Sequence, residues 1–262
     1  MKDDGTVRMT RAGDVAVLTI DRPAKLNAMT VAMDRRMNEL TFEINNDDDI
    51  RAVVLTGAGD RAFCAGSDIT DLDGYGSNWQ YRNRFGARRD YARAVWDVRK
   101  PIVAAIDGYA IGGGLEMACA SDIRLATAGS SFAAGEIQWG WHGGSGATQL
   151  LTRAIGPGHA SRLLLTGDRI DGAEALRIGL VQELIAPDVL QEKALELAAR
   201  IASRSPIAAQ SVKNLVRVAQ SASVEVGLAY ENDMFSYCMM TADAAEGRAA
   251  FAEKREPRFS GS

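Results

Sequence analysis

Two glutamates stand in stretches of the chain that are otherwise almost free of charge. Glu116 lies in the apolar run 110–120, and Glu136 follows the small residues 133–135. A carboxylate in apolar surroundings is costly unless it is paired or has a chemical role. A salt bridge to Arg124 would account for one such residue. A pair of them close to a glycine-rich helix start favours general acid–base chemistry.

The glycine-rich segment is Gly112-Gly113-Gly114, which follows an expected strand and precedes an expected helix. Three glycines at the N-terminus of a helix leave backbone N–H groups bare and let a ligand approach the main chain. No Lys-Ser or Lys-Thr follows, so the segment is not a nucleotide-binding P-loop. The fragment alone also fits a tight turn that needs only small residues, and both interpretations stay open.

Two further motifs carry less information. Residues 57–62 read G-x-G-x-x-A, the pattern of a dinucleotide-binding turn, but residues 63–66 do not begin the helix that such a turn requires. His142 lies in the segment 139–144 (WGWHGG) and could act as a general base. No Ser or Cys nucleophile stands at a recognisable spacing from it. We interpret His142 as a pocket-lining or hydrogen-bonded residue.

Short apolar runs and helical patterns alternate along the first two thirds of the chain. The runs 15–20, 52–56, 102–106 and 123–126 predict buried strands. Helical spacing of apolar residues lies between them, as at Met33, Met37, Leu40 and Ile44, and at Tyr91, Val95 and Val98. This alternation predicts an α/β domain whose strands are covered on both faces.

The last third has a different pattern. From Pro187 onward the chain shows only helical periodicity, with apolar faces over 190–201 and 208–219 and Pro206 at the start of the second helix. We therefore divide the chain into an α/β core over 1–185 and a helical region over 186–262.

Composition excludes several classes of protein. The 262 residues are 47% hydrophobic with a net charge of −4, which argues against a dedicated nucleic-acid binder. Three cysteines without a C-x-x-C spacing and two histidines give no basis for a disulfide framework or a metal site. The polar N-terminus is not a signal peptide, and no apolar run approaches 18 residues. We expect a soluble cytoplasmic protein with no membrane partner.

The order of these segments resembles the enoyl-CoA hydratase/isomerase (crotonase) superfamily over almost the whole chain. The resemblance rests on five motifs in the family's order: 21–29 (DRPAKLNAM), 63–69 (FCAGSDI), 100–116 with its three glycines and Glu116, 165–181 (beginning LTGDRI), and 246–259 at the C-terminal end. It implies a spiral of ββα turns followed by a helical C-terminal part, and an acyl-coenzyme A thioester as substrate. It also implies a homotrimer or a dimer of trimers, in which region 186–262 serves oligomerisation and completes the CoA site. No cofactor is implied, because coenzyme A is part of the substrate.

The resemblance assigns roles to individual residues. The backbone N–H groups of Ser67 and Gly113 form an oxyanion hole, Glu116 is the base, and Glu136 is the acid. Together they would add water across the 2,3-double bond of a 2-enoyl-CoA. The bulky Trp141 and His142 are expected to shape the acyl pocket. The expected CoA-binding residues are Lys25, Leu26, Ala65, Asp68, Ile69, Phe251 and Lys254.

Two other functions fit the same family resemblance. A Δ3,Δ2-enoyl-CoA isomerase can work with one glutamate, so the pair of glutamates favours the hydratase. A non-catalytic crotonase-fold protein that binds RNA is disfavoured by the acidic net charge and the intact carboxylate pair. The family commonly has Pro-Gly where this chain has Gly143-Gly144, so the sequence leaves the identity of the acyl group open.

Overall fold

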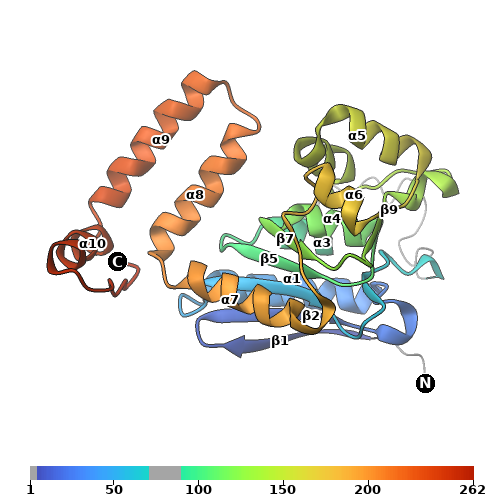
Figure 1. Cartoon of the computed structure of the whole chain (residues 1–262), viewed down its shortest axis with the longest axis horizontal. Helices are drawn as coiled ribbons and strands as arrows, with labels where there is room; N and C mark the ends of the chain where they lie inside the picture. Colours follow the sequence, from blue (N-terminus) through green and yellow to red (C-terminus); the bar gives the residue numbers. More distant parts are fainter. Residues whose placement is uncertain (1–4, 71–89) are drawn as a thin grey trace.

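The computed structural model describes residues 5–70 and 90–262, and its described strands form two sheets (Figure 1). The larger sheet has the order β1-β2-β3-β5-β7-β10, and the smaller has the order β4-β6-β8-β9. The strands are β1 (Thr6–Ala12), β2 (Val15–Asp21), β3 (Ala52–Gly57), β4 (Ala62–Cys64), β5 (Ile102–Ile106), β6 (Tyr109–Ile111), β7 (Ile123–Ala126), β8 (Ser131–Ala133), β9 (Ile170–Asp171) and β10 (Glu183–Leu184).

Three successive strand pairs build the two sheets together. In each of the pairs β3–β4, β5–β6 and β7–β8 the first strand joins the larger sheet and the second joins the smaller one. Within each sheet, the strand of one pair lies parallel to the corresponding strand of the next pair. Helix α3 (Tyr91–Trp96) comes after β4, α4 (Gly113–Ala120) directly after β6, and α5 (Thr152–Thr166) after β8. This repeat confirms the predicted α/β class and the ββα spiral.

The remaining helices complete the spiral and extend it toward the C-terminus. None of the helices in the described part of the chain is both long enough and apolar enough to cross a membrane. The α-helices are α1 (Val31–Asn46), α6 (Gly172–Arg177), α7 (Leu190–Ala202), α8 (Pro206–Ala219), α9 (Val224–Met239) and α10 (Ala242–Glu253), and the short 3₁₀- or π-helices are η1 (Pro23–Lys25), η3 (Gly135–Trp139), η4 (Ala147–Leu151) and η5 (Pro187–Val189).

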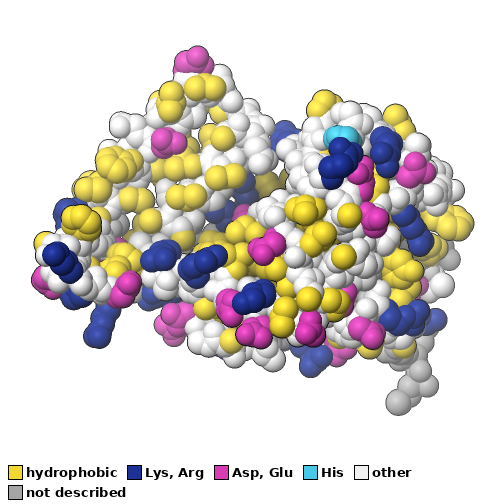
Figure 2. All heavy atoms as spheres, in the orientation of Figure 1, with side chains coloured by type: hydrophobic (Ala, Val, Ile, Leu, Met, Phe, Trp, Pro, Cys, Tyr) yellow, Lys and Arg dark blue, Asp and Glu magenta, His cyan; other side chains and the backbone are white. Residues whose placement is uncertain are grey.

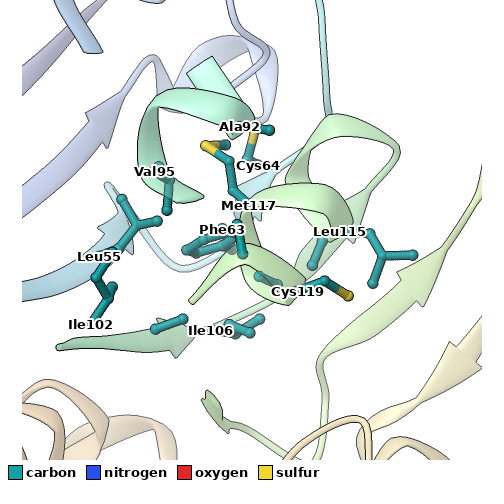
Figure 3. Close-up of a cluster of buried hydrophobic side chains, with 14 of the residues drawn as sticks. Leu55, Phe63, Cys64, Ala92, Val95, Ile102, Ile106, Leu115, Met117 and Cys119 are labelled. Atoms are coloured by element: carbon teal, nitrogen blue, oxygen red, sulfur yellow. The ribbon is translucent and has the colours of Figure 1, made fainter. Parts of the chain in front are cut away.

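The larger sheet is covered on both faces, as its apolar strands predict. Helix α7 packs on one face, where Ala194 and Ala198 meet the side chains of β2, β3 and β5. On the other face, α1, α3 and α4 and the smaller sheet enclose the main core, in which Phe63 and Met117 are completely buried (Figure 3). The core therefore fixes the start of α4, where the glycine-rich segment lies.

Helices α8, α9 and α10 form an arm that projects from the rest of the molecule (Figure 1). Lys213 ties α8 to the core, because its Nζ lies 2.7 Å from Asp122 Oδ2 and donates to the carbonyl of Lys100 at 2.7 Å. Lys213 is also the one residue of α8 that is buried, and α9 has no buried residue. Figure 2 shows hydrophobic side chains along the surface of this arm. The apolar face predicted for 208–219 is therefore helical but largely uncovered within one chain. The division of the chain at 185 stays a prediction.

Candidate active site

A cavity of about 270 Å³ opens between the starts of α3 and α4, the loop after β4 and the segment 135–145. Eight of the candidate residues singled out in the sequence meet there. Those that line it are Ala65, Ser67, Ile69, Gly113, Glu116, Glu136, Trp141 and His142. Across residues 5–70 and 90–262, no group of three or more His, Cys, Asp or Glu side chains is placed to hold a metal ion.

Glu116 lies in the first turn of α4 and is 4% exposed. Its Oε1 accepts hydrogen bonds from the backbone N–H groups of Ser145 at 2.7 Å and Ala147 at 3.1 Å. Burial raises the pKa of Glu116 to about 7, the two N–H groups oppose this rise, and the charge of Glu136 adds to it. At neutral pH this carboxyl is thus poised to give or take a proton.

The salt bridge to Arg124 that the sequence left open does not form. The guanidinium of Arg124 donates to the backbone carbonyls of Ala118, Ser121 and Leu180. Those bonds fasten α4 and β7 to the segment after α6, which is a structural role. Glu116 is therefore held by main-chain N–H groups and not by a cation.

Glu136 stands at the start of η3, on the wall of the same cavity. Burial raises its pKa, while its own backbone N–H and the nearby His142 oppose the rise. The Oε2 atom is buried and accepts no hydrogen bond from any described residue. Buried carboxylate oxygens are normally hydrogen-bonded, so this atom is suited to a polar ligand entering the cavity.

The raised pKa of Glu116 predicts a pH-dependent stability. In the folded protein this pKa is about 7, above the ordinary value of 4.5, so the folded state keeps a proton that the unfolded chain loses. The resulting stabilisation is complete below pH 4.5 and is lost as the pH rises to about 7. Glu116→Gln is neutral throughout and should avoid this loss. From about pH 4 to about pH 8, urea titrations should show the free energy of unfolding of the variant gaining on the order of 3 kcal/mol relative to wild type. Parallel pH profiles would contradict the raised pKa.

The loop after β4 brings Ser67 beside the start of α4. Met29 and Ser67 form a parallel bridge, in which Met29 N donates to Gly66 O and Asp68 N donates to Met29 O, both at 2.8 Å. A Cβ added to Gly66 would lie 3.1 Å from Gly113 N, so the two backbone segments are neighbours. Neither Ser67 N nor Gly113 N donates to an acceptor in the described part of the chain. Two such N–H groups on one cavity wall can bind an oxygen that becomes negative.

The structure supports the tight-turn interpretation of the three glycines, and the ligand-binding interpretation stays a prediction. Gly112 has a φ of 56°, which favours glycine, and a Cβ at Gly114 would lie 2.0 Å from the carbonyl oxygen of Cys64. These two positions thus serve the turn and its close packing. The N–H of Gly113 donates to no acceptor in the described part of the chain, and its contact with a ligand stays a prediction.

Among the cavity residues that the sequence analysis gave no site role are Asp90, Tyr91 and Ser145. Tyr91 was recognised only as part of an apolar helix face, yet its hydroxyl lies 2.8 Å from Ser67 Oγ and against Gly113. Asp90 and Ser145 are 55 positions apart and their side chains are hydrogen-bonded. The one sequence signal for Ser145 was its place in the glycine-rich segment 143–146.

The expected CoA-binding residues of the N-terminal half gather near the cavity mouth. Ala65 and Ile69 line it, and Leu26 accepts a hydrogen bond from Ala65 N at 3.0 Å through its carbonyl. Lys25 is exposed in the adjoining η1. Asp68 pairs with Arg22 at 2.6 Å, which lowers the pKa of Asp68 to about 2 and makes its main contact structural. Their contact with CoA stays a prediction.

Phe251 and Lys254 lie elsewhere. Both belong to the end of α10, which Figure 1 places at the far end of the arm from α4. The ring of Phe251 is 88% exposed, and neither residue lines the cavity of its own chain. Their contact with CoA likewise stays a prediction.

The chain as a whole is similar to a known protein family. The family described as enoyl-CoA hydratase/isomerase matches residues 10–262. The chain belongs to this family. This match confirms the family that the sequence motifs indicated.

Relatives within the enoyl-CoA hydratase/isomerase family span nearly the whole chain. A short-chain-enoyl-CoA hydratase of Clostridium acetobutylicum is 37% identical over 95% of this chain and 95% of that protein. A crotonyl-CoA hydratase of Syntrophomonas wolfei is 34% identical over 94% of both. The crystal structure of an enoyl-CoA hydratase from Bacillus anthracis matches with a TM-score of 0.92 and 33% identity, covering 98% of this chain and all of that one. The fold is thus that of known enoyl-CoA hydratases.

Proposed function

We propose that the protein is an enoyl-CoA hydratase, a hydro-lyase that reversibly adds water across the 2,3-double bond of a 2-enoyl-CoA thioester. The observation that carries this proposal is the pair Glu116 and Glu136. Both are held in one cavity with raised pKa values, beside two N–H groups that lack protein acceptors in the described chain. The similar proteins from Clostridium and Syntrophomonas carry hydratase names.

The thioester carbonyl is the group that the two N–H donors would bind. Hydrogen bonds from Ser67 and Gly113 favour the negative charge that this oxygen gains as the enolate forms. The N-terminal end of α4, which begins at Gly113, adds a positive potential at the same point. Withdrawal of electrons toward this oxygen makes C3 of the enoyl group electrophilic.

The two glutamates carry out the proton transfers that accompany the addition of water. Glu116 takes a proton from the water while the water oxygen attacks C3, and Glu136 gives a proton to C2. The Oε1 atom of Glu116 is held by Ser145 and Ala147, which leaves Oε2 for the water. The charge of Glu136 adds to the rise in the pKa of Glu116, so an ionised Glu136 favours the protonated form of Glu116.

The acyl group would enter past Trp141 and His142. Trp141 is 43% exposed at the cavity wall, and the Nδ1 of His142 lies 2.8 Å from the carbonyl oxygen of Gly143. Because both side chains line the cavity, they support a role in shaping the acyl pocket.

The experiment that tests the function is turnover of a panel of acyl-CoAs. With crotonyl-CoA and longer or branched 2-enoyl-CoAs, the absorbance of the conjugated thioester should fall as water adds. A 3-enoyl-CoA should give little signal. A rise of that absorbance from the 3-enoyl-CoA, without consumption of crotonyl-CoA, would identify an isomerase instead.

We also propose that the functional unit is a homotrimer or a dimer of trimers. The support is the uncovered apolar surface of the arm, where Val212, Val216 and Phe235 are each more than half exposed. An apolar surface of this extent is typical of an interface between copies. In such an assembly α10 of one copy could complete the CoA site of another.

Lys254→Ala is expected to raise KM for crotonyl-CoA about two- to fivefold and to leave kcat nearly unchanged, because an exposed ion pair to a CoA phosphate contributes up to about 1 kcal/mol. Lys254 is exposed at the end of α10, remote from the reacting atoms. Steady-state kinetics at low and high salt should show the difference from wild type shrinking as salt rises. A crotonyl-pantetheine thioester, which has no nucleotide, is the control. An equal penalty with both substrates would mean that Lys254 supports the fold or a subunit contact.

A further inference from the structure

The orientation of Glu116 depends on a turn made largely of glycine. Ser145 and Ala147 supply the two N–H groups that bind its Oε1, and Oε2 accepts no hydrogen bond from a described residue. A Cβ at Gly143 would lie 2.7 Å from Oε1, so the turn approaches the carboxylate closely. The position of this turn therefore decides where Oε2 points.

Such a turn needs an anchor. Gly143, Gly144 and Gly146 surround Ser145, and Gly146 has a φ of 127°, so this backbone has more conformational freedom than most. The one polar side chain in the segment 143–147 is that of Ser145, and its hydroxyl donates a hydrogen bond to Oδ2 of Asp90. Through this bond the turn is fastened to another part of the molecule.

Asp90 is itself held firmly. Its Oδ1 accepts a hydrogen bond from Arg93 N at 2.9 Å and so caps the N-terminus of α3. The next residue, Tyr91, is 5% exposed and hydrogen-bonded to Ser67, and Ala92 and Val95 of the same helix lie in the main core (Figure 3). Each carboxylate oxygen of Asp90 thus accepts one hydrogen bond, Oδ1 from Arg93 N and Oδ2 from the Ser145 hydroxyl. Helix α3, which Asp90 caps, packs against α4.

We propose that Asp90 and Ser145 are positioning residues for Glu116. The hydroxyl of Ser145, held by Asp90, fixes the turn 143–147, and the N–H groups of that turn fix the carboxylate so that Oε2 faces the water. Neither side chain has to touch the substrate. This inference rests on the proposed hydratase function and adds two residues to its machinery.

Ser145→Ala tests the anchor directly, because it removes the hydroxyl and keeps both N–H groups. We expect kcat for crotonyl-CoA to fall about 10- to 100-fold with KM little changed, because a catalytic group displaced by about 1 Å can lose on the order of 10²-fold in rate. Ser145→Thr restores a hydroxyl and should recover most of the rate. Ser203→Ala, at an exposed serine after α7, is the matched control. A wild-type kcat for Ser145→Ala would overturn the proposal.

Asp90→Ala should lower kcat about as much as Ser145→Ala does. Because this replacement also removes the N-cap of α3, a second variant that loses only a helix cap is needed as the control. Asp171 caps the six-residue helix α6 as Asp90 caps the six-residue α3, and Asp171 does not line the cavity. Asp171→Ala should cost a similar thermal stability and leave kcat unchanged. An equal loss of kcat in both variants would show that Asp90 acts only through general stability.

Combining Ser145→Ala with Glu116→Gln shows whether Ser145 acts through Glu116 or in another way. In a Glu116→Gln background, Ser145→Ala should lower the residual kcat by less than threefold, because the residue that it positions no longer works as a base. A full 10- to 100-fold decrease in that background would contradict the proposal. A wild-type protein that hydrates no enoyl-CoA would contradict the proposed function itself. An active wild-type protein with an equally active Ser145→Ala variant would contradict only the positioning role.

Discussion

Replacing Glu116 or Glu136 by Gln should lower kcat for 2-enoyl-CoA hydration by about 10²- to 10⁴-fold, the range expected for a general acid or base. In the Glu116→Gln variant, the new side-chain amide keeps an oxygen for the N–H groups of Ser145 and Ala147, so the turn has no reason to move. What is lost is the ability to exchange a proton. Steady-state kinetics with crotonyl-CoA measures the effect.

The double variant shows whether the two carboxylates act as a unit. Its kcat should fall far less than the product of the two single decreases, because either replacement alone already stops the concerted proton transfers. Glu196→Gln, at an exposed glutamate paired with Lys193, is the control and should keep the wild-type rate. Wild-type hydration by either single variant would remove that glutamate from the mechanism.

Gly113→Ala is expected to lower kcat/KM by about 10²- to 10³-fold, the usual loss when one oxyanion donor is removed. A Cβ at this position would lie 1.8 Å from the hydroxyl oxygen of Tyr91, which is buried. Either the ring or the backbone must move, and a backbone shift displaces the N–H of Gly113. Kinetics combined with circular dichroism separates a lost donor from a lost fold.

Two further variants sharpen this result. Gly158→Ala in α5, where a Cβ meets nothing within 4 Å, should leave kcat/KM unchanged. Tyr91→Ala makes room for the new methyl group, so Gly113→Ala should cost less in that background than in wild type. If Gly113→Ala folds normally and keeps full activity, the N–H of Gly113 does not bind the reacting oxygen.

Sequence patterns predicted the fold where the elements are long and apolar. The runs in β3, β5 and β7 are buried on both faces, and β2 has one buried and one half-buried face, so all four form continuous apolar segments in the sequence. The smaller sheet gave no such signal. Its strands β4, β6 and β8 have three residues each, too few to show any periodicity. The spiral could therefore be expected from the family resemblance but not from the patterns.

The same contrast holds for the candidate site. Glu116 and Glu136 were visible because a charge in an apolar segment is costly. The hydroxyl of Tyr91 was hidden, because an aromatic residue at helical spacing is accounted for by packing alone. The bond from Ser145 to Asp90 joins two ordinary polar residues from distant segments, and only the folded chain brings them together. The uncovered face of α8 was likewise invisible, since its periodicity equals that of a buried helix.

The central claim, that this cavity adds one water across a 2,3-double bond, is tested most directly by following the oxygen atom. Crotonyl-CoA is incubated with the protein in water enriched in heavy oxygen, and the acyl-CoA products are examined by mass spectrometry. The proposed function predicts 3-hydroxybutyryl-CoA with one heavy oxygen at C3, with Glu116→Gln and Glu136→Gln forming it far more slowly. Free CoA with heavy oxygen in the released carboxylate, or unchanged crotonyl-CoA, would contradict it.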